Sequence, residues 1–363
     1  MDRRAFLISA AGPFGSLPAA CNSAAPPSCG GRAKRTELVV PRIGQISQAR
    51  REALSRDPGR RGARELNETI PEIDAIELQN PWPAVAPRKT LRLISWNLAR
   101  ARHWREGARL IEEHPALNEP DLVFLQEMDL GMARSGNAHT TRAVAEALQM
   151  NYAFGVEFLE LTKGTPVERW KYGGANEWGY HGNALLSRYP LRDLRMVRFP
   201  GIEKWYQNSQ QRLGGRMGLF GTVMLPGPVT VVVTHLEGGP EYPQVRRCQM
   251  ELILEELRAS SHGQPVLLGG DLNAPPDEPT LTVLEEAGFE VRESNELRAP
   301  TRQRSVLGDA VLTEAHIDYL CVRGARVVVD DTSPKVVAAV YPRRGEGTIL
   351  SDHAIVCAKV EIS

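Results

Sequence analysis

The chain has 363 residues, of which 42% are hydrophobic, so it is long enough to bury a large core as one large or two ordinary globular domains. Its 44 basic and 44 acidic residues balance, but residues 1–89 hold 14 of the basic and 9 of the acidic ones, which leaves 30 basic and 35 acidic residues from Thr90 onward. This slightly acidic remainder lacks the broad positive charge that a long polyanion needs, so charge does not favour nucleic acid as the ligand.

Residues 1–21 are predicted to be an export signal. Arg3 and Arg4 precede a modest apolar run that ends in small residues, which is typical of a twin-arginine signal. The run is too short, and too often interrupted by Gly and Pro, to span a bilayer. The segment that ends at Cys21 also resembles a lipoprotein cleavage box, and a cleaved soluble signal is the equal alternative. We therefore expect a bacterial protein outside the cytoplasm, either periplasmic or anchored to a membrane through a lipid on Cys21.

Three of the five cysteines lie in apolar stretches and are interpreted as packed thiols, namely Cys248, Cys321 and Cys357. No two cysteines have the spacing of a CxxC pair. The cysteine pattern therefore indicates neither a zinc site nor a disulfide framework.

Residues 22–89 differ in composition from the rest of the chain. They are rich in Ala, Pro, Gly and Arg, with a charged stretch from Ala49 to Glu68. We interpret them as a tether or extension that includes a short polar helix, with a plain linker as the favoured form. A folded domain of different composition is expected to occupy residues 90–363.

From Thr90 onward, short apolar runs alternate with helical patterns and with Gly or Pro turns. Strands are predicted at 91–96, 122–125, 183–186, 219–224, 229–234, 266–268, 317–322 and 354–360. Apolar residues at helical spacing predict helices at 141–150 and 244–257. Strands interleaved with helices indicate an α/β domain in which two packed sheets are covered by helices.

Polar residues follow the ends of these apolar strands, where a sheet can present them without burying them. Asn97 ends the first strand, Glu127 the second, His235 a later one, and Asp271-Leu272-Asn273 another. Asp318 and Asp352-His353 follow near the C-terminus. Any one of these residues alone would be read as a turn former or a satisfied core polar group. For there to be no functional site here, every one of these residues would have to be purely structural at the same time.

In chain order the series reads Asn, Glu, Gly-Asn, His, Asp-x-Asn, Asp and Asp-His. It closely resembles the endonuclease/exonuclease/phosphatase superfamily, which includes DNase I-like nucleases, neutral sphingomyelinases, inositol-polyphosphate phosphatases and deadenylases. The segment Gly182–Arg188 also matches the Gly-Asn-x-x-Leu-Ser strand of that family, and the resemblance covers residues 90–363. It implies a four-layered α/β sandwich with two packed, mostly antiparallel β-sheets flanked by helices.

The resemblance also implies a metal site. Glu127 would be the principal ligand of a hard divalent cation, with Asn97 and Asp352 supporting it directly or through water. Mg²⁺ is the expected ion, and Mn²⁺ is the alternative.

Catalytic roles follow for five residues from the same resemblance. Asp271 would orient and deprotonate the attacking water, and Asn273 would steady the phosphate or the nucleophile. His235 and His353 would donate hydrogen bonds to the phosphate oxygens or protonate the leaving group, and Asp318 would fix the tautomer of His353.

Weaker candidates for substrate binding are His181, Asn183 and Arg216, since single polar residues near turns are more often solvated. Four aromatic residues lie in or beside a Gly-rich loop from Gly164 to Gly182, namely Trp170, Tyr172, Trp178 and Tyr180. Such a loop could grip a lipid head group or a base, or could pack on the sheet edge.

The sequence thus predicts an exported, Mg²⁺-dependent phosphoester hydrolase that attacks phosphorus with a metal-assisted water. Its substrate would be a phospholipid head group, a small phosphoester or nucleic acid, and no protein partner is indicated. The alternatives are an extracytoplasmic nuclease of the same fold and a surface-tethered binding module without turnover.

Overall fold

The computed structural model describes residues 32–56, 63–200, 204–302, 314–329, 335–341 and 347–362. The predicted export signal, with Cys21, lies outside the described residues. Among the helices that the model describes, none is long and apolar enough to cross a membrane.

One sheet has the strand order β1-β8-β10-β11-β12-β13. Its strands are β1 (Lys34–Thr36), β8 (Arg192–Arg198), β10 (Met217–Leu225), β11 (Gly227–His235), β12 (Val266–Asp271) and β13 (Asp318–Arg323). Only the β11–β12 pair in this path is parallel, and the other pairs are antiparallel.

The second sheet has the main order β14-β18-β4-β5-β7-β6-β3-β2, with β15 beside β18 and β9 beside β6. Its strands are β2 (Val39–Val40), β3 (Ile76–Gln79), β4 (Leu91–Asn97), β5 (Leu122–Leu130), β6 (Asn151–Glu160), β7 (Tyr180–Ser187), β9 (Arg212–Gly214), β14 (Ala325–Val327), β15 (Val336–Val337) and β18 (Ile355–Ile362). A small separate pair is formed by β16 (Val340–Tyr341) and β17 (Thr348–Ile349).

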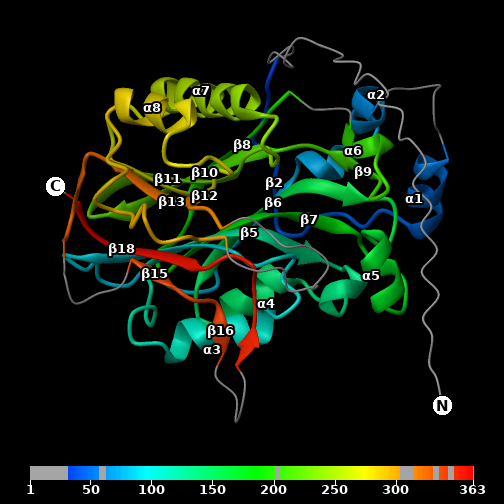
Figure 1. Ribbon diagram of the computed structural model, residues 1–363, viewed down its shortest axis with the longest axis horizontal. Helices are drawn as coiled ribbons and strands as arrows, with labels where there is room; N and C mark the ends of the chain where they lie inside the picture. Colours follow the sequence, from blue (N-terminus) through cyan, green and yellow to red (C-terminus); the bar gives the residue numbers. More distant parts are fainter. Residues whose placement is uncertain are drawn as a thin grey trace, which may run out of the picture.

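Helices cover both outer faces of the two sheets, as Figure 1 shows. The pair α7 (Pro243–Ser260) and α8 (Pro279–Glu286) lies on the first sheet, and α3 (Trp104–Glu113) and α4 (Thr140–Ala147) lie on the second. The remaining helices are α1 (Gln48–Ser55), α2 (Ala63–Glu68), α5 (Pro166–Lys171), α6 (Lys204–Gln207) and the 3₁₀ helices η1 (Pro71–Asp74) and η2 (Ala133–Ser135). The predicted four-layered α/β sandwich is therefore confirmed.

The core follows from the two-residue period of a strand. In β4, Leu91 and Leu93 pack between the two sheets, whereas Ile94 and Trp96 face the layer that holds α3 and α4. Because both faces of such a strand are covered, it reads as an almost continuous apolar run, which is why these strands were visible in the sequence.

Every predicted strand and both predicted helices are present, with ends that differ by a few residues. The sequence analysis missed two long strands, β6 and β8. Glu157 and Glu160 lie within β6 although they are fully buried, and charged residues of this kind hid its apolar pattern.

The stretch 22–89 differs from the tether that we expected, in the part that is described. β1 pairs with β8, and β3 joins β2 to β6, so this stretch adds strands to both sheets. Ile43, Leu54 and Leu66 are buried in the core cluster beside the second sheet. These apolar residues were not recognised in the sequence because they are scattered among Gly, Pro and Arg. Each helix or strand here is also too short to show a helical or strand periodicity.

The cysteines also differ in part from expectation. Cys321 and Cys357 are buried and lie outside any disulfide, which agrees with packed thiols. Cys248, on α7, is instead disulfide-bonded.

Candidate active site

The predicted site residues meet where strands of both sheets end. Asn97 is the last residue of β4, and its side-chain amide donates a hydrogen bond to the Oδ2 atom of Asp271 at 3.0 Å. Its Oδ1 atom accepts from the backbone N–H of Ala99 at 2.9 Å. Because β4 and β12 belong to different sheets, the Asn97–Asp271 hydrogen bond ties the two sheets together at this end.

Glu127 lies in a β-bulge of β5, where the pairing with β7 shifts register between Leu125 and Met128. Its φ of 60° is in the left-handed region, which non-glycine residues seldom adopt. The bulge turns the Glu127 side chain out of the regular alternation of the strand, and part of it stays exposed. No hydrogen bond from a described residue reaches its carboxylate. Although burial raises its pKa, the nearby His181, Arg100, His235 and His353 hold that pKa well below the ordinary value.

Asp271 stands between two histidines because three neighbouring strands are in register. His235 on β11 lies opposite Asp271 on β12, which lies opposite Asp318 on β13. The Oδ2 atom of Asp271 is 3.3 Å from Nε2 of His235 and 3.8 Å from Nε2 of His353. Burial and the neighbouring charge of Asp318 raise the pKa of Asp271 to about 7.

His353 forms a carboxylate–imidazole pair with Asp318, whose Oδ2 atom is 2.9 Å from Nδ1. The loop before β18 is held in place because Ser351 donates to the backbone oxygen of Asn97 and accepts from the N–H of His353. Burial lowers the pKa of His353, but the charges of Asp318 and Asp271 outweigh it and raise that pKa well above the ordinary value.

His235 is in the opposite electrostatic state. Burial, helped by the positive charge of Arg216, lowers the pKa of His235 well below the ordinary value. Near neutral pH the two imidazoles beside Asp271 therefore differ, with His353 charged and His235 neutral. Such a difference suits one group to hold a developing negative charge and the other to accept or pass on a proton.

Asn273 and Asp352 lie at the exposed edge of the same cluster. Asn273 has a φ of 50°, donates its backbone N–H to Asp271 at 3.0 Å and its side-chain amide to the oxygen of Leu236 at 3.1 Å. Asp352 is half-buried, and burial raises the pKa of its carboxyl group. Both side chains keep part of their surface open, so a ligand can reach the cluster from solvent.

Two of the three weaker candidates also reach this region. Arg216 lies 3.3 Å from Glu157, which in turn lies 4.0 Å from Nδ1 of His235. His181 is buried on β7, and its charge acts directly on Glu127. Asn183 is fully buried, and the one hydrogen bond found for it goes to the sulfur of Met217, so it faces the inter-sheet layer.

The donor set fits a hard divalent cation at Glu127. An ionised carboxylate without a hydrogen-bonding protein partner, with amide and carboxylate oxygens of Asn97 and Asp352 available nearby, is the chemistry that Mg²⁺ and Mn²⁺ prefer. Asp271, Asp318 and His353 also offer ligand atoms that lie within 4.8 Å of one another. Asp318 and His353 of this triad already bond each other, whereas the Glu127 carboxylate has no such partner among the described residues.

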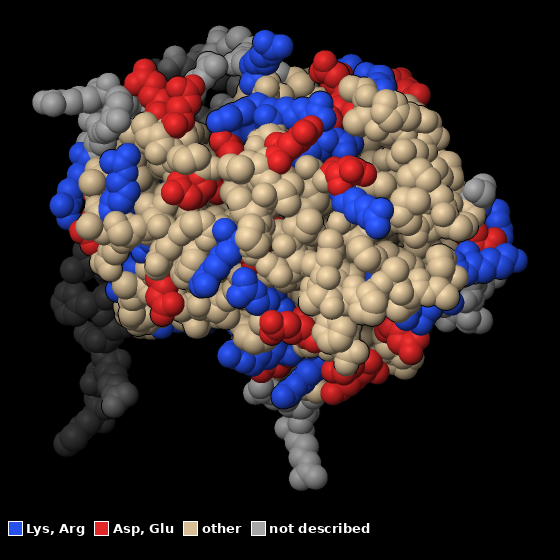
Figure 2. Space-filling model, turned by 180° about the vertical axis from the view of Figure 1, so that it is seen from behind, with Lys and Arg blue, Asp and Glu red and all other residues tan. Residues whose placement is uncertain are grey.

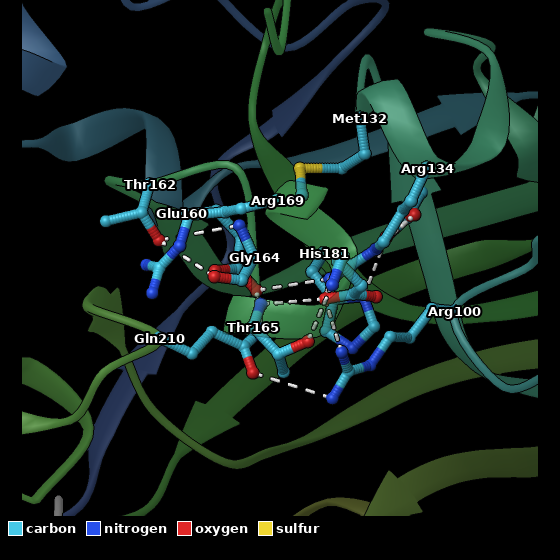
Figure 3. Close-up of polar contacts among 12 residues, drawn as sticks. Arg100, Met132, Arg134, Glu160, Thr162, Gly164, Thr165, Arg169, His181 and Gln210 are labelled. Carbon is cyan, nitrogen blue, oxygen red and sulfur yellow. Dashed lines mark hydrogen bonds and ion pairs between the residues drawn. The ribbon is translucent and has the colours of Figure 1, made fainter. Parts of the chain in front are cut away.

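Sequence reasoning missed the charged network behind Glu127, which Figure 3 shows in part. Asp129 accepts two hydrogen bonds from Arg134, at 2.9 and 2.8 Å, and lies 2.8 Å from Nδ1 of His181. Glu168 forms ion pairs with Arg100 at 2.5 Å and with Arg134 at 3.5 Å. These residues could have been recognised in the sequence from the number of charged residues within otherwise apolar strands and the loops beside them.

Part of the aromatic loop packs on the protein, which is one of its two expected uses. Tyr180 is fully buried and donates its hydroxyl to the oxygen of Gly44 at 2.8 Å, and Trp178 packs under Arg42 at 5.0 Å. Trp170, on α5, is 86% exposed. Packing on the sheet edge thus accounts for Trp178 and Tyr180 only.

Comparison with known proteins gives one family match. The model of the Endonuclease/Exonuclease/phosphatase family matches residues 94–353, a segment that contains all the predicted metal-binding and catalytic residues. No curated protein matches the sequence.

Similar solved structures share the fold at low identity. The human Nocturnin catalytic domain with bound sulfate anion is 18% identical with a TM-score of 0.52, over 77% of this chain and 97% of that one. An endonuclease/exonuclease/phosphatase from Beutenbergia cavernae is 20% identical with a TM-score of 0.51, over 76% of this chain and 72% of that one. A protein from Enterococcus faecalis is 17% identical with a TM-score of 0.50, over 75% of this chain and all of that one.

Proposed function

From the premise that this chain belongs to the Endonuclease/Exonuclease/phosphatase family of phosphoester-hydrolysing enzymes, we propose that it is an exported Mg²⁺-dependent hydrolase of a small phosphoester or a phospholipid head group. The observation that carries the proposal is the position of Asp271. Its carboxylate lies between a charged and a neutral imidazole. The Glu127 carboxylate, which accepts no hydrogen bond from a described residue, interacts electrostatically with both imidazoles.

The metal would be held by Glu127, with Asn97 and Asp352 as supporting ligands. When bound, the cation would supply a positive charge against the phosphate oxygens and lower the cost of nucleophilic attack. Asn97 is restrained for this role because its amide group is fixed by Ala99 on one side and Asp271 on the other.

The chain's own residues would complete the chemistry. Asp271 would orient the attacking water and take its proton, and Asn273, fixed by Leu236, would hold the phosphate. His353, kept charged by Asp318, would donate to a phosphate oxygen as negative charge builds there. Neutral His235 would donate its N–H beside it, or would pass to the leaving group the proton that Asp271 takes from the water, since its Nε2 atom lies 3.3 Å from Asp271.

His181 is proposed as a substrate contact, with Asp129 as the residue that positions it. Its Nδ1 side is enclosed by Asp129 and Arg134, at 2.8 and 3.1 Å. No described residue bonds its Nε2 atom, so that atom is available to the phosphate. Arg216 would add positive charge on the side of His235.

Charge supports a small ester or a lipid head group over a long nucleic acid. Across the face in Figure 2, basic and acidic side chains lie interspersed rather than gathered by sign. A protein that tracks a long polyanion normally gathers its Lys and Arg on one face.

The disulfide at Cys248 supports export. Disulfides form and persist in oxidising compartments, which are outside the cytoplasm in most bacteria. Together with the Arg3-Arg4 signal, it supports a periplasmic or membrane-anchored location. Cell fractionation of the full-length chain and of a Cys21→Ser variant tests this: we expect both outside the cytoplasm, with the variant released from the membrane if Cys21 carries lipid. Recovery of the intact chain from the cytosol alone would contradict export.

A substrate panel tests the enzymatic proposal. Phospholipid vesicles, small phosphomonoesters and phosphodiesters, and single-stranded DNA and RNA are each incubated with the folded protein in Mg²⁺ and in EDTA. We expect Mg²⁺-dependent release of phosphate or alcohol from one of the first two classes. A folded protein that leaves every class intact would refute the proposal, and cleavage confined to nucleic acid would replace it with the nuclease alternative.

A further inference from the structure

The loop between β4 and α3 has an unusual backbone directly after the proposed metal ligand Asn97. Ala99, Arg100 and Ala101 have φ values of 47°, 65° and 46°, so three consecutive non-glycine residues adopt the left-handed conformation. This conformation costs energy for each such residue, and runs of it occur where the surrounding structure enforces them. Here Ala99 and Ala101 are buried, and the loop is fixed by Asn97 and by Gln126, whose backbone oxygen accepts from Leu98.

The strained loop places two arginines beside each other at the metal-binding end. The guanidinium of Arg100 lies 2.5 Å from Glu168 and 3.5 Å from the side-chain oxygen of Gln210, and the side chain keeps 23% of its surface exposed. Arg102 donates its Nε–H to the oxygen of Ala99 at 2.9 Å, and its buried Nη1 group has no hydrogen-bond partner. A buried guanidinium donor without an acceptor is costly, so a ligand that supplies oxygen atoms would relieve this cost.

The arginines around Arg100 and Arg102 outnumber the carboxylates that pair with them. Arg134 is paired with Asp129, and Arg212 and Arg216 lie beside Glu160 and Glu157. Glu168 serves Arg100 and Arg134 together. Arg102 has no carboxylate within ion-pair distance among the described residues. A divalent cation on Glu127 and Asp352 would use the two remaining acidic groups that act on Arg102, so Arg100 and Arg102 together keep one positive charge that no carboxylate balances.

The arginine pair is separate from the position of the attacked phosphorus. The groups that would act on that phosphorus, Asp271, His235 and His353, come from the side of β11, β12 and β18. Arg100 instead forms an ion pair with Glu168 on α5, which also pairs with Arg134. Figure 3 shows Arg100 and Arg134 near His181. The Glu127 carboxylate interacts electrostatically with Arg100 of the first group and with His235 and His353 of the second.

Building on the proposed function, we infer that Arg100 and Arg102 form a second anion subsite, which binds a further phosphate group of the substrate beside the one that is hydrolysed. The shared chemistry is a phosphoester that carries a second phosphate a few bonds away. Two sources can supply it: a small bisphosphate, or a nucleotide that bears phosphates on two positions of its sugar. Guanidinium groups suit this ligand because they donate paired hydrogen bonds to phosphate oxygens.

The test is a comparison of affinities by titration calorimetry of the full chain in saturating Mg²⁺. One pair of probes is fructose 6-phosphate and fructose 1,6-bisphosphate, and the other is thymidine 5′-monophosphate and thymidine 3′,5′-diphosphate. We expect the second phosphate to tighten binding by roughly tenfold or more in at least one pair, and the pair that shows the larger ratio identifies the source. Equal affinities within both pairs, or no binding of any probe, would overturn the inference.

Variants make the comparison specific. Arg102→Gln should bring the ratio of affinities toward one, and Arg102→Lys should restore part of it because it keeps the charge. Arg105→Gln, an exposed arginine in the first turn of α3, is the matched control and should leave the ratio as in the parent chain. If Arg102→Gln weakens the mono- and bisphosphate by the same factor, Arg102 serves the attacked phosphate and the second subsite is refuted. Because calorimetry needs no turnover, failure of hydrolysis in the substrate panel and failure of this subsite are separate results.

Discussion

Asp318 illustrates how a single buried carboxylate can set the charge of a neighbouring group. It bonds Nδ1 of His353 at 2.9 Å, and its own backbone N–H is held by the hydroxyl of Thr301 at 3.1 Å. The pair is therefore fixed in orientation as well as in charge. The ability of His353 to stabilise the charge that develops on phosphate would therefore depend on Asp318.

Replacing Asp318 by Asn keeps the shape but removes the charge that keeps His353 protonated. We expect Asp318→Asn to lower kcat by about 100-fold or more, with a small change in KM, because general acid–base contributions are typically of this size. Steady-state kinetics on the substrate found in the panel measures both parameters. Asp74→Asn, at a buried carboxylate that pairs with Arg198 at 3.2 Å, is the control for loss of a buried charge elsewhere. Similar kcat losses in the two variants would contradict the role of Asp318.

The carboxylate of Glu77 makes a contribution to the free energy of unfolding that depends on pH. Burial alone would raise its pKa, but His139 and Tyr152, at 2.8 and 2.7 Å, together with Arg142 and the backbone N–H of Ile43, lower that pKa to about 2. Since the pKa is lower in the folded than in the unfolded chain, the stabilisation is full above about pH 4.5 and is lost as pH falls toward 2.

We therefore expect Glu77→Gln to be less stable than the parent chain at pH 6, with a difference that shrinks between about pH 5 and pH 2. Urea unfolding at several pH values, followed by tryptophan fluorescence, measures this difference. A difference that stays constant across that range would show that Glu77 stabilises the fold by packing rather than by charge.

At the scale of elements, β12 shows why two glycines precede Asp271. A Cβ atom on Gly269 would lie 2.5 Å from Cγ of Phe124, on the opposite sheet, and one on Gly270 would lie 2.4 Å from the backbone oxygen of Thr234. The two sheets approach closely here, and this approach brings Asp271 within reach of Asn97.

Gly269→Ala should therefore push the sheets apart where the site is assembled. We expect a loss of about 1–3 kcal/mol in the free energy of unfolding, typical of overpacked cores, together with reduced activity. Gly227→Ala is the control, because a Cβ there meets nothing within 4 Å. Thermal unfolding and activity are measured for both variants. Equal stability of the two would show that the close approach of the sheets at Gly269 does not require a glycine.

The elements that the sequence predicted well are those buried on both faces. β4, β11 and β12 are apolar runs that end in polar residues, so both their existence and their functional ends were visible. β6 was missed because Glu157 and Glu160 interrupt its pattern, and their buried partners are arginines that lie far away in sequence. Pairings of this kind depend on the tertiary fold and leave no local signal.

The same limit applies to the candidate site. The order of polar residues predicted which side chains would meet, and the structure brings Asn97, Asp271, His235, Asp318 and His353 into contact. The strained backbone of Arg100 and the charged network of Asp129, Arg134 and Glu168 could not be predicted. Left-handed residues other than Gly or Asn have no signature in sequence, and the network joins three separate elements, β5, η2 and α5.

At the scale of the whole molecule, the described part of the stretch before Thr90, residues 32–56 and 63–89, forms part of the folded unit. β1 extends one sheet and β2 and β3 extend the other, and the side chain of Arg51 bonds the backbone oxygens of Ile46, Asn176 and Trp178. The family match from residue 94 therefore does not mark the start of what must fold.

A chain that begins at Thr90 should consequently be much less stable than one that begins at Arg32. Removing this stretch exposes the apolar surface that Ile43, Leu54 and Leu66 cover, and it leaves an edge of each sheet unpaired. We expect the shorter chain to aggregate or to be digested rapidly by a protease, while the longer one resists. Equal protease resistance of the two chains would support the tether that the composition suggested.

The central claim is that Glu127 holds a divalent cation against a phosphoester beside Asp271. The most direct measurement is the rate of hydrolysis of bis(4-nitrophenyl) phosphate as Mg²⁺ is varied, for the parent chain and for Glu127→Gln. We predict saturable activation by Mg²⁺ in the parent chain, abolition by EDTA, and a loss of about 100-fold or more in Glu127→Gln that excess Mg²⁺ only partly restores. Activation by Mg²⁺ that is the same in both proteins would show that Glu127 does not hold the cation. A rate that is independent of Mg²⁺ and EDTA would show that hydrolysis needs no cation.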